Sequence, residues 1–153
     1  MKKGIIIALI CLLSVLTVSC AVVLLLSYTA PYSLMHGVPD IDTVKIEIVN
    51  LETEMGYHAG SPYNEESVSV FKVIERDKIE DFLSDFKKIK SYQPIFGSRI
   101  DSISGEAIRI TYDNGDIELI TQHGTATVID GEIRNRTVTF DSEEFEALLQ
   151  KYS

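Results

Sequence analysis

A tyrosine-rich stretch carries the side chains best suited to bind a partner. Tyr57, His58 and Tyr63 fall within MGYHAGSPYN, and Tyr92 opens a second stretch, YQPIFG. Tyrosine brings a large amphipathic ring with little conformational entropy to lose, a composition favoured at binding surfaces. Long loops on rigid scaffolds are also where binding groups concentrate. We therefore predict binding residues here; the alternative is that the loop only covers a sheet edge and its tyrosines pack back.

Patterns that assemble a catalytic or metal centre do not occur in the sequence. The histidines, at positions 36, 58 and 123, have no spacing typical of a metal site. No serine stands in a G-x-S-x-G or S-x-x-K setting, and no glycine pattern matches a phosphate-binding loop. The run DNGDIE at 113–118 fails the calcium-loop spacing and is better explained as a hairpin. The sequence predicts no metal, no cofactor and no catalysis.

The charge is concentrated after the first 31 residues. All 23 acidic residues lie there with 12 of the 14 lysines and arginines, which gives that part a net charge of −11. Such a domain as a whole has no electrostatic attraction for nucleic acid or for anionic lipid headgroups. Both cysteines, Cys11 and Cys20, lie in the apolar N-terminal stretch and point to opposite faces of a helix, so they cannot pair within it.

The N-terminal segment predicts a membrane anchor. Ile5 to Leu26 is an uncharged run of 22 residues, and a helix of that length spans about 33 Å, close to the hydrocarbon core of a bilayer. A cleavable signal has a shorter apolar region. LTVSC, ending at Cys20, resembles a lipoprotein signal, but the apolar run continues past it. We expect a retained helix; the alternatives are a lipoprotein cleaved before Cys20 and an ordinary cleaved signal.

The same segment predicts the location of the protein. Lys2 and Lys3 place the N-terminus in the cytoplasm by the positive-inside rule, so the C-terminal domain lies outside the cell membrane. Tyr28 and Tyr32 fall where interfacial aromatic residues would sit. We expect residues 1–30 to form the anchor or signal, 31–40 a short linker, and 41–153 one extracytoplasmic domain.

Alternating apolar and polar residues predict six strands in this domain. Asn-Gly at 114–115 and Asp-Gly at 130–131 mark hairpin turns, and His-Gly at 123–124 marks another. Residues 51–66 and 91–105 are expected to be irregular. The predicted strands are 43–48, 68–74, 107–112, 117–121, 125–129 and 133–140.

Two helices are predicted from apolar stripes and end signals. Asp77 to Glu80 and Asp141 to Glu144 have the spacing of capping boxes, in which each end of the motif bonds a backbone amide. The order ββαββββα predicts an α+β fold, an antiparallel sheet with both helices on one face and a wet polar face opposite. The stripes comprise Ile79, Phe82, Leu83, Phe86 and Ile89 in the first helix, and Phe145, Leu148, Leu149 and Tyr152 in the second.

The chain resembles the small uncharacterised membrane-anchored or secreted proteins of Gram-positive bacteria. The likeness rests on the Met-Lys-Lys start, the single apolar span, the strand–helix junction around Asp77 and the Tyr112-Asp113-Asn114-Gly115 hairpin. It covers most of the chain through generic motifs. It implies an exported α+β domain and transfers no activity and no functional residue.

We therefore expect a non-catalytic module that binds another protein or an envelope component, attached to the membrane by its N-terminal helix. One alternative is an exported lipoprotein. Another is an immunity-like or inhibitor protein whose acidic face meets a basic partner. A third is a small enzyme that works through carboxylates, which requires a deep pocket lined by at least two acidic residues, one of them with a raised pKa.

Overall fold

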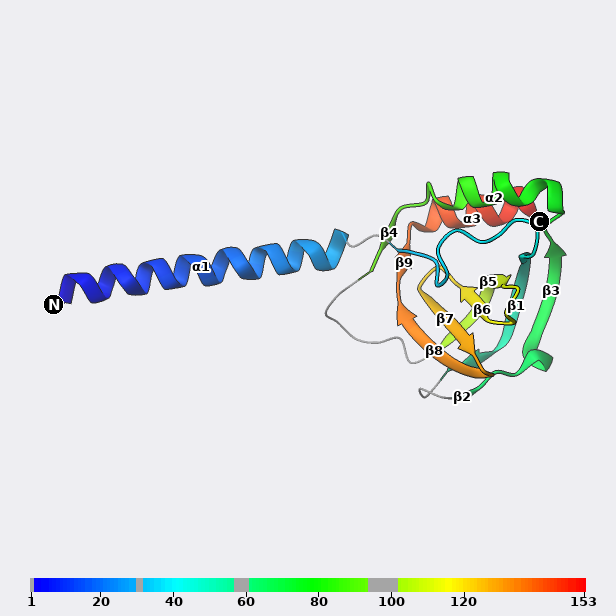
Figure 1. Ribbon diagram of the computed structural model, residues 1–153, viewed down its shortest axis with the longest axis horizontal. Helices are drawn as coiled ribbons and strands as arrows, with labels where there is room; N and C mark the ends of the chain where they lie inside the picture. Colours follow the sequence, from blue (N-terminus) through cyan, green and yellow to red (C-terminus); the bar gives the residue numbers. More distant parts are fainter. Residues whose placement is uncertain (1, 30–31, 57–60, 94–101) are drawn as a thin grey trace.

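The computed structural model describes residues 2–29, 32–56, 61–93 and 102–153, and it confirms the predicted α+β class. Helix α1 (Lys2–Thr29) extends away from a domain made of a curled antiparallel sheet and the helices α2 and α3 (Figure 1). Within α1, Gly4–Leu25 is a stretch of 22 residues long and apolar enough to cross a membrane. A signal sequence near the N-terminus can pass the same test of length and composition.

The described residues form one seven-stranded antiparallel sheet and one small two-stranded sheet. The order in the large sheet is β2-β8-β7-β6-β5-β1-β3. The small sheet pairs β4 (Ser91–Tyr92) with β9 (Thr139–Phe140) at the end of the domain nearest α1 (Figure 1). The strands of the large sheet are β1 (Lys45–Met55), β2 (Ser61–Pro62), β3 (Val68–Val73), β5 (Ile103–Thr111), β6 (Ile117–Ile120), β7 (Gly124–Ile129) and β8 (Glu132–Thr137).

The hairpin turns follow the sequence signals. Gly115 has a φ of 87° between β5 and β6, and Asp130 and Gly131 have φ values of 53° and 78° between β7 and β8. Glycine and, to a lesser extent, aspartate accept this left-handed backbone, which matches the twist of the strands on either side. These turns fix the register in which β5 to β8 pair as a meander.

Helices α2 (Ile79–Phe86) and α3 (Ser142–Tyr152) lie side by side over one face of the sheet, as predicted (Figure 1). Their apolar stripes pack on the β1, β5 and β6 side chains that point to the same face, among them Ile48, Ile108 and Ile120. Helix α2 ends at Phe86, so Ile89 follows the helix and is only partly buried.

The opposite face of the sheet is buried, and the prediction of a wet polar face is wrong. The sheet curls, and the segment that leads from β2 through the 3-10 turn η1 (Glu65–Ser67) to β3 joins its two opposite edges. Tyr63 and Val68 of that segment pack against an inner cluster that includes Leu119. Polar residues on this face, such as Glu47 and Arg109, are therefore enclosed.

Two strands are longer than predicted. Strand β1 continues to Met55 and β5 begins at Ile103, and these two residues pair with each other. The polar run between Leu51 and Met55 indicated a loop, but Leu51 and Met55 both turn into the inner cluster, and their burial extends the strand through a shift in register. At the other end of the sheet, the strand predicted over 133–140 is interrupted at Val138, which separates β8 from β9.

The two predicted capping boxes have different outcomes. Asp141 caps α3, because its carboxylate accepts a hydrogen bond from the Glu144 amide at 3.1 Å. The Glu144 side chain does not complete the box; it accepts hydrogen bonds from the backbone amide and Nζ of Lys90. Asp77 lies in a 3-10 turn, η2 (Arg76–Lys78), and no side chain caps α2.

This difference predicts unequal stability losses at two matched aspartates. Asp141→Ala removes a capping hydrogen bond and should lower the free energy of unfolding by about 1 kcal/mol. Asp77→Ala removes no cap and should change it by less than about 0.5 kcal/mol. Urea unfolding of the full chain in detergent micelles measures both, and equal losses would contradict the assignment.

Candidate functional site

The segment that follows α1 is packed on the domain although it forms no helix or strand. Positions 30 and 31 separate α1 from Tyr32 in the sequence, and Tyr32 contacts the same core cluster as α2 and α3. Leu34, Met35 and Ile41 pack against that cluster too. The described part of the predicted linker thus packs on the domain through Tyr32, Leu34 and Met35.

A buried carboxyl group, Glu118 on β6, holds this segment in place. Its Oε2 accepts hydrogen bonds from the Met35 amide at 2.8 Å and from the Tyr112 hydroxyl at 2.9 Å. Its Oε1 accepts a hydrogen bond from the Tyr32 hydroxyl. Glu118 is 1 % exposed, so these donors replace the water that the carboxyl group loses on burial.

Ring contacts and one ion pair reinforce these bonds. The Tyr32 ring meets Phe140 edge-on at 5.3 Å, and His36 meets Tyr112 edge-on at 4.6 Å. His36 Nε2 lies 3.0 Å from Asp116 Oδ2, a contact that becomes an ion pair when the imidazole is protonated. We call this set the clasp; it joins Tyr32, Met35 and His36 to Tyr112, Asp116 and Glu118.

Burial raises the pKa of Glu118 to about 7. The hydrogen bond from the Met35 amide and the positive charge of Arg136 both lower this pKa, but burial has the larger effect. The arrangement suits a neutral acid, because a protonated Oε1 can donate to the Tyr32 oxygen while Oε2 keeps its two donors. Glu118 does not line any of the five main cavities among the described residues. Its raised pKa therefore reflects its enclosure in the clasp.

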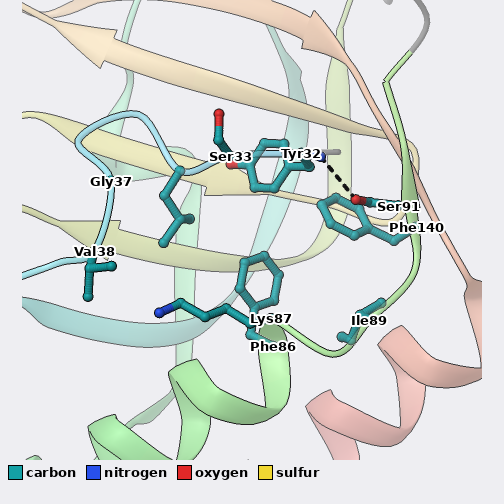
Figure 2. Close-up of a pocket in the computed structure, with 10 residues that line it drawn as sticks. Tyr32, Ser33, Gly37, Val38, Phe86, Lys87, Ile89, Ser91 and Phe140 are labelled. Atoms are coloured by element: carbon teal, nitrogen blue, oxygen red, sulfur yellow. Dashed lines mark hydrogen bonds between the residues drawn. The ribbon is translucent and has the colours of Figure 1, made fainter. Parts of the chain in front are cut away.

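A cavity of about 450 Å³ lies between the segment after α1 and the C-terminal end of α2. Figure 2 shows the rings of Tyr32, Phe86 and Phe140 gathered toward one end and the Lys87 chain extending toward Val38 at the other. Ser91 of β4 lies beside Phe140, and its hydroxyl accepts a hydrogen bond from the Tyr32 amide at 3.3 Å (Figure 2). Pockets of 300–1,000 Å³ with mostly apolar walls are typical of small-molecule sites.

Tyr63, a predicted binding residue, belongs to a charge cluster centred on Arg109. The Arg109 guanidinium donates to Glu47 Oε2 from Nε at 2.8 Å and from Nη2 at 2.7 Å, and Nη1 donates to Glu65 at 2.5 Å and to the Tyr63 hydroxyl at 3.3 Å. Burial raises the pKa of Tyr63 to about 12. The Tyr63 hydroxyl is therefore bonded to the arginine, and a binding role for this tyrosine stays a prediction.

The other predicted site residues lie elsewhere. Tyr57 and His58 fall outside the described residues. Tyr92 lies on β4 and is 46 % exposed, away from the Arg109 cluster and close to α1. Cys20 is exposed within α1. In the described ranges, no three side chains of histidine, cysteine, aspartate or glutamate come together in a way that would hold a metal ion.

An exposed apolar patch lies on β3, at one edge of the large sheet. Val70, Phe71 and Val73 are 45 %, 60 % and 46 % exposed, and we call them the β3 patch. Strand β3 pairs only with β1 among the described strands. Phe71 has no residue opposite it, because Val49 pairs with Val70 and the next pair is Ile48 with Lys72. The unpaired Phe71 forms a β-bulge, which turns its side chain outward.

Sequence reasoning named Tyr32, His36 and Tyr112 for other reasons, but it did not bring the clasp residues together, and it did not single out the β3 patch. Glu118 stands in the strand IELI as an ordinary polar residue of an alternating pattern, and nothing local shows that Tyr32 covers it. The patch had a signal: VSVFKV has apolar residues on both faces, which is unusual for a strand with one wet side.

No protein-family model, no curated protein and no solved structure matches the chain. The resemblance to small exported proteins of Gram-positive bacteria therefore stays a prediction, and the function has to follow from the geometry of these sites.

The clasp predicts a specific pH dependence of stability. Because folding raises the pKa of Glu118 from 4.5 to about 7, its contribution is fully present below pH 4.5 and is lost as the pH rises through 7. The wild type should lose on the order of 2–3 kcal/mol between pH 5 and pH 8 relative to Glu118→Gln, which cannot ionise. Urea unfolding at each pH measures the difference; parallel curves for the two proteins would contradict it.

Proposed function

We propose that this protein is a membrane-anchored module whose extracytoplasmic domain binds another protein of the cell envelope without catalysing a reaction. The observation that carries the proposal is the β3 patch. Exposed apolar groups clustered on an unpaired edge strand are costly in water and invite association unless a partner covers them.

The form of the patch indicates how a partner is bound. An unpaired edge strand offers backbone donors and acceptors for an extended segment, and its side chains give specificity. The bulge at Phe71 and the charge of Lys72 limit continuous pairing with another flat strand, which is how natural edges avoid self-association. We therefore place the main contact at the side chains of Val70, Phe71 and Val73, with at most a short backbone pairing.

Features of the N-terminus support a retained anchor. Helix α1 runs without interruption past Cys20 to Thr29, and Tyr32 is already part of the domain. A lipoprotein cleaved before Cys20 would have this apolar segment in place of a flexible polar tether. Lys2 and Lys3 support a cytoplasmic N-terminus, and the C-terminal domain then lies outside.

The carboxylate-enzyme alternative finds little support in the described cavities. Glu75 and Asp81 line one of them together with Lys78 and other lysines. The hydrogen bond from Lys78 holds the pKa of Glu75 below its usual range, which is opposite to what a general acid needs. The group with a raised pKa, Glu118, lies in the clasp and not in this cavity.

The retained anchor predicts the mass of the mature protein. The protein extracted from membranes should still contain the residues from Lys2 to Ser19 joined to Cys20, and its mass should include them. Mass spectrometry of the purified protein measures this directly. A mature chain that begins at Cys20 and carries a diacylglycerol group would overturn the anchor in favour of the lipoprotein alternative.

The β3 patch predicts site-specific crosslinking in intact cells. A photoreactive phenylalanine analogue at position 71 should give one dominant adduct with another envelope protein, whereas the same analogue at exposed Gln150 on α3 should not. Val70→Lys together with Val73→Lys should reduce that adduct by about tenfold or more, because two charges enter the apolar contact.

Folding of the double variant is checked by circular dichroism. Adducts of equal strength at positions 71 and 150, or an adduct that survives the double variant, would contradict the proposed contact. A dominant adduct between two copies of this chain would contradict a foreign partner and would show that the β3 patch mediates self-association.

A further inference from the structure

We propose that the cavity between residues 32–38 and the C-terminal end of α2 binds a phospholipid of the adjoining leaflet, with one hydrocarbon chain inside and the phosphate at Lys87. The inference rests on the proposed anchor, since α1 must remain in the membrane. It goes beyond protein binding and concerns a surface separate from the β3 patch.

The position of the cavity brings it close to the lipid headgroups. The apolar span ends at Leu25, and four further helical residues to Thr29 add about 6 Å. Three residues then lead to Tyr32, at most about 11 Å farther. Headgroups occupy roughly 5–7 Å beyond the hydrocarbon on each side. Tyr32, which lines the cavity, is therefore within about 12 Å of the headgroup layer.

Strand β4 places the cavity on the side of the domain that faces α1 and, with the proposed anchor, the membrane. It contacts α1, and its Ser91 lines the cavity and bonds the Tyr32 amide. Tyr92, the next residue, is exposed on the same side. Tyrosines are enriched at this depth of the bilayer because the ring and hydroxyl suit the boundary between apolar and polar layers. The short sheet formed by β4 and β9 thus lies at the membrane end of the domain (Figure 1).

The lining suits a hydrocarbon chain. Aromatic and aliphatic side chains dominate it, and Val38 is 69 % exposed at its edge. A large apolar side chain left in water beside a bilayer gains free energy by contact with acyl chains, as do the cavity walls. The residues that provide this lining are Tyr32, Leu34, Val38, Phe86, Ile89 and Phe140.

Lys87 gives the cavity a positive charge that can bind a phosphate. Three lysines follow one another closely at the end of α2, but Lys88 pairs with Asp85 and Lys90 pairs with Glu144. Lys87 has no ion pair within the described part of the chain, and its side chain extends along the cavity toward Val38 (Figure 2). A phosphate is the anion that a membrane surface offers to such an ammonium group.

The clasp keeps this cavity open. Residues 32–38 form one wall, and Glu118 holds that wall through Tyr32 and Met35. The cavity is thus built between the segment that follows α1 and helix α2 of the domain.

The test uses the full chain in vesicles of phosphatidylglycerol and phosphatidylcholine that contain phosphatidylglycerol with a photoreactive diazirine in one acyl chain. After irradiation, peptide mass spectrometry should find adducts on α1 and also on residues 32–38 and 86–91. Val38→Glu and Lys87→Glu should each reduce the cavity adducts by about fivefold or more, since each weakens one part of the site. The adducts on α1 should not change.

Lys72→Glu is the matched control. It makes the same charge change on β3, outside the cavity lining, and should leave the cavity adducts as they are. Adducts confined to α1, or cavity adducts unchanged in both variants, would overturn the lipid site and leave the anchor standing. Loss of the α1 adducts, with a protein that no longer floats with the vesicles, would overturn the anchor and with it this inference.

Discussion

The half of the domain nearest α1 depends on one buried carboxyl group. A carboxyl enclosed without partners costs several kcal/mol, so Glu118 is stable in the core only because Tyr32, Met35 and Tyr112 supply donors. Two of those donors belong to the segment that leaves α1. The same bonds that satisfy Glu118 therefore attach the segment that follows α1 to the domain and hold one wall of the cavity.

A second buried charge organises the other half. Arg109 projects into the curl of the sheet, where Glu47 of the neighbouring strand and Glu65 of the segment from β2 to β3 neutralise it. That segment joins the two sheet edges, which closes the inner face but leaves the outer edge of β3 unpaired among the described strands. The exposed β3 patch is thus a consequence of how the sheet closes, and it is the surface to which we assign partner binding.

Much of the fold could be predicted because its signals are local. The Asn-Gly turn at 114–115, the stripe from Ile79 to Phe86 and the Asp141 cap depend on residues a few positions apart, and all three occur in the structure. The clasp could not be predicted in this way, because its residues are far apart in the sequence. Tyr32 and Glu118 are 86 positions apart, and neither residue type nor spacing indicates that they meet. Tyr63 was noticed for its chemistry, yet its hydroxyl is occupied by Arg109.

The sequence by itself determined an apolar N-terminal helix, an acidic α+β domain with two amphipathic helices on one face, and the positions of the hairpin turns. These follow from periodicity, turn chemistry and charge, which act over short distances along the chain. Only the tertiary structure decided that the polar face of the sheet is enclosed, that residues 32–38 are part of the domain, and that β3 keeps an exposed edge. The physical reason is that burial depends on which distant segments cover a strand, and the curl of the sheet sets that.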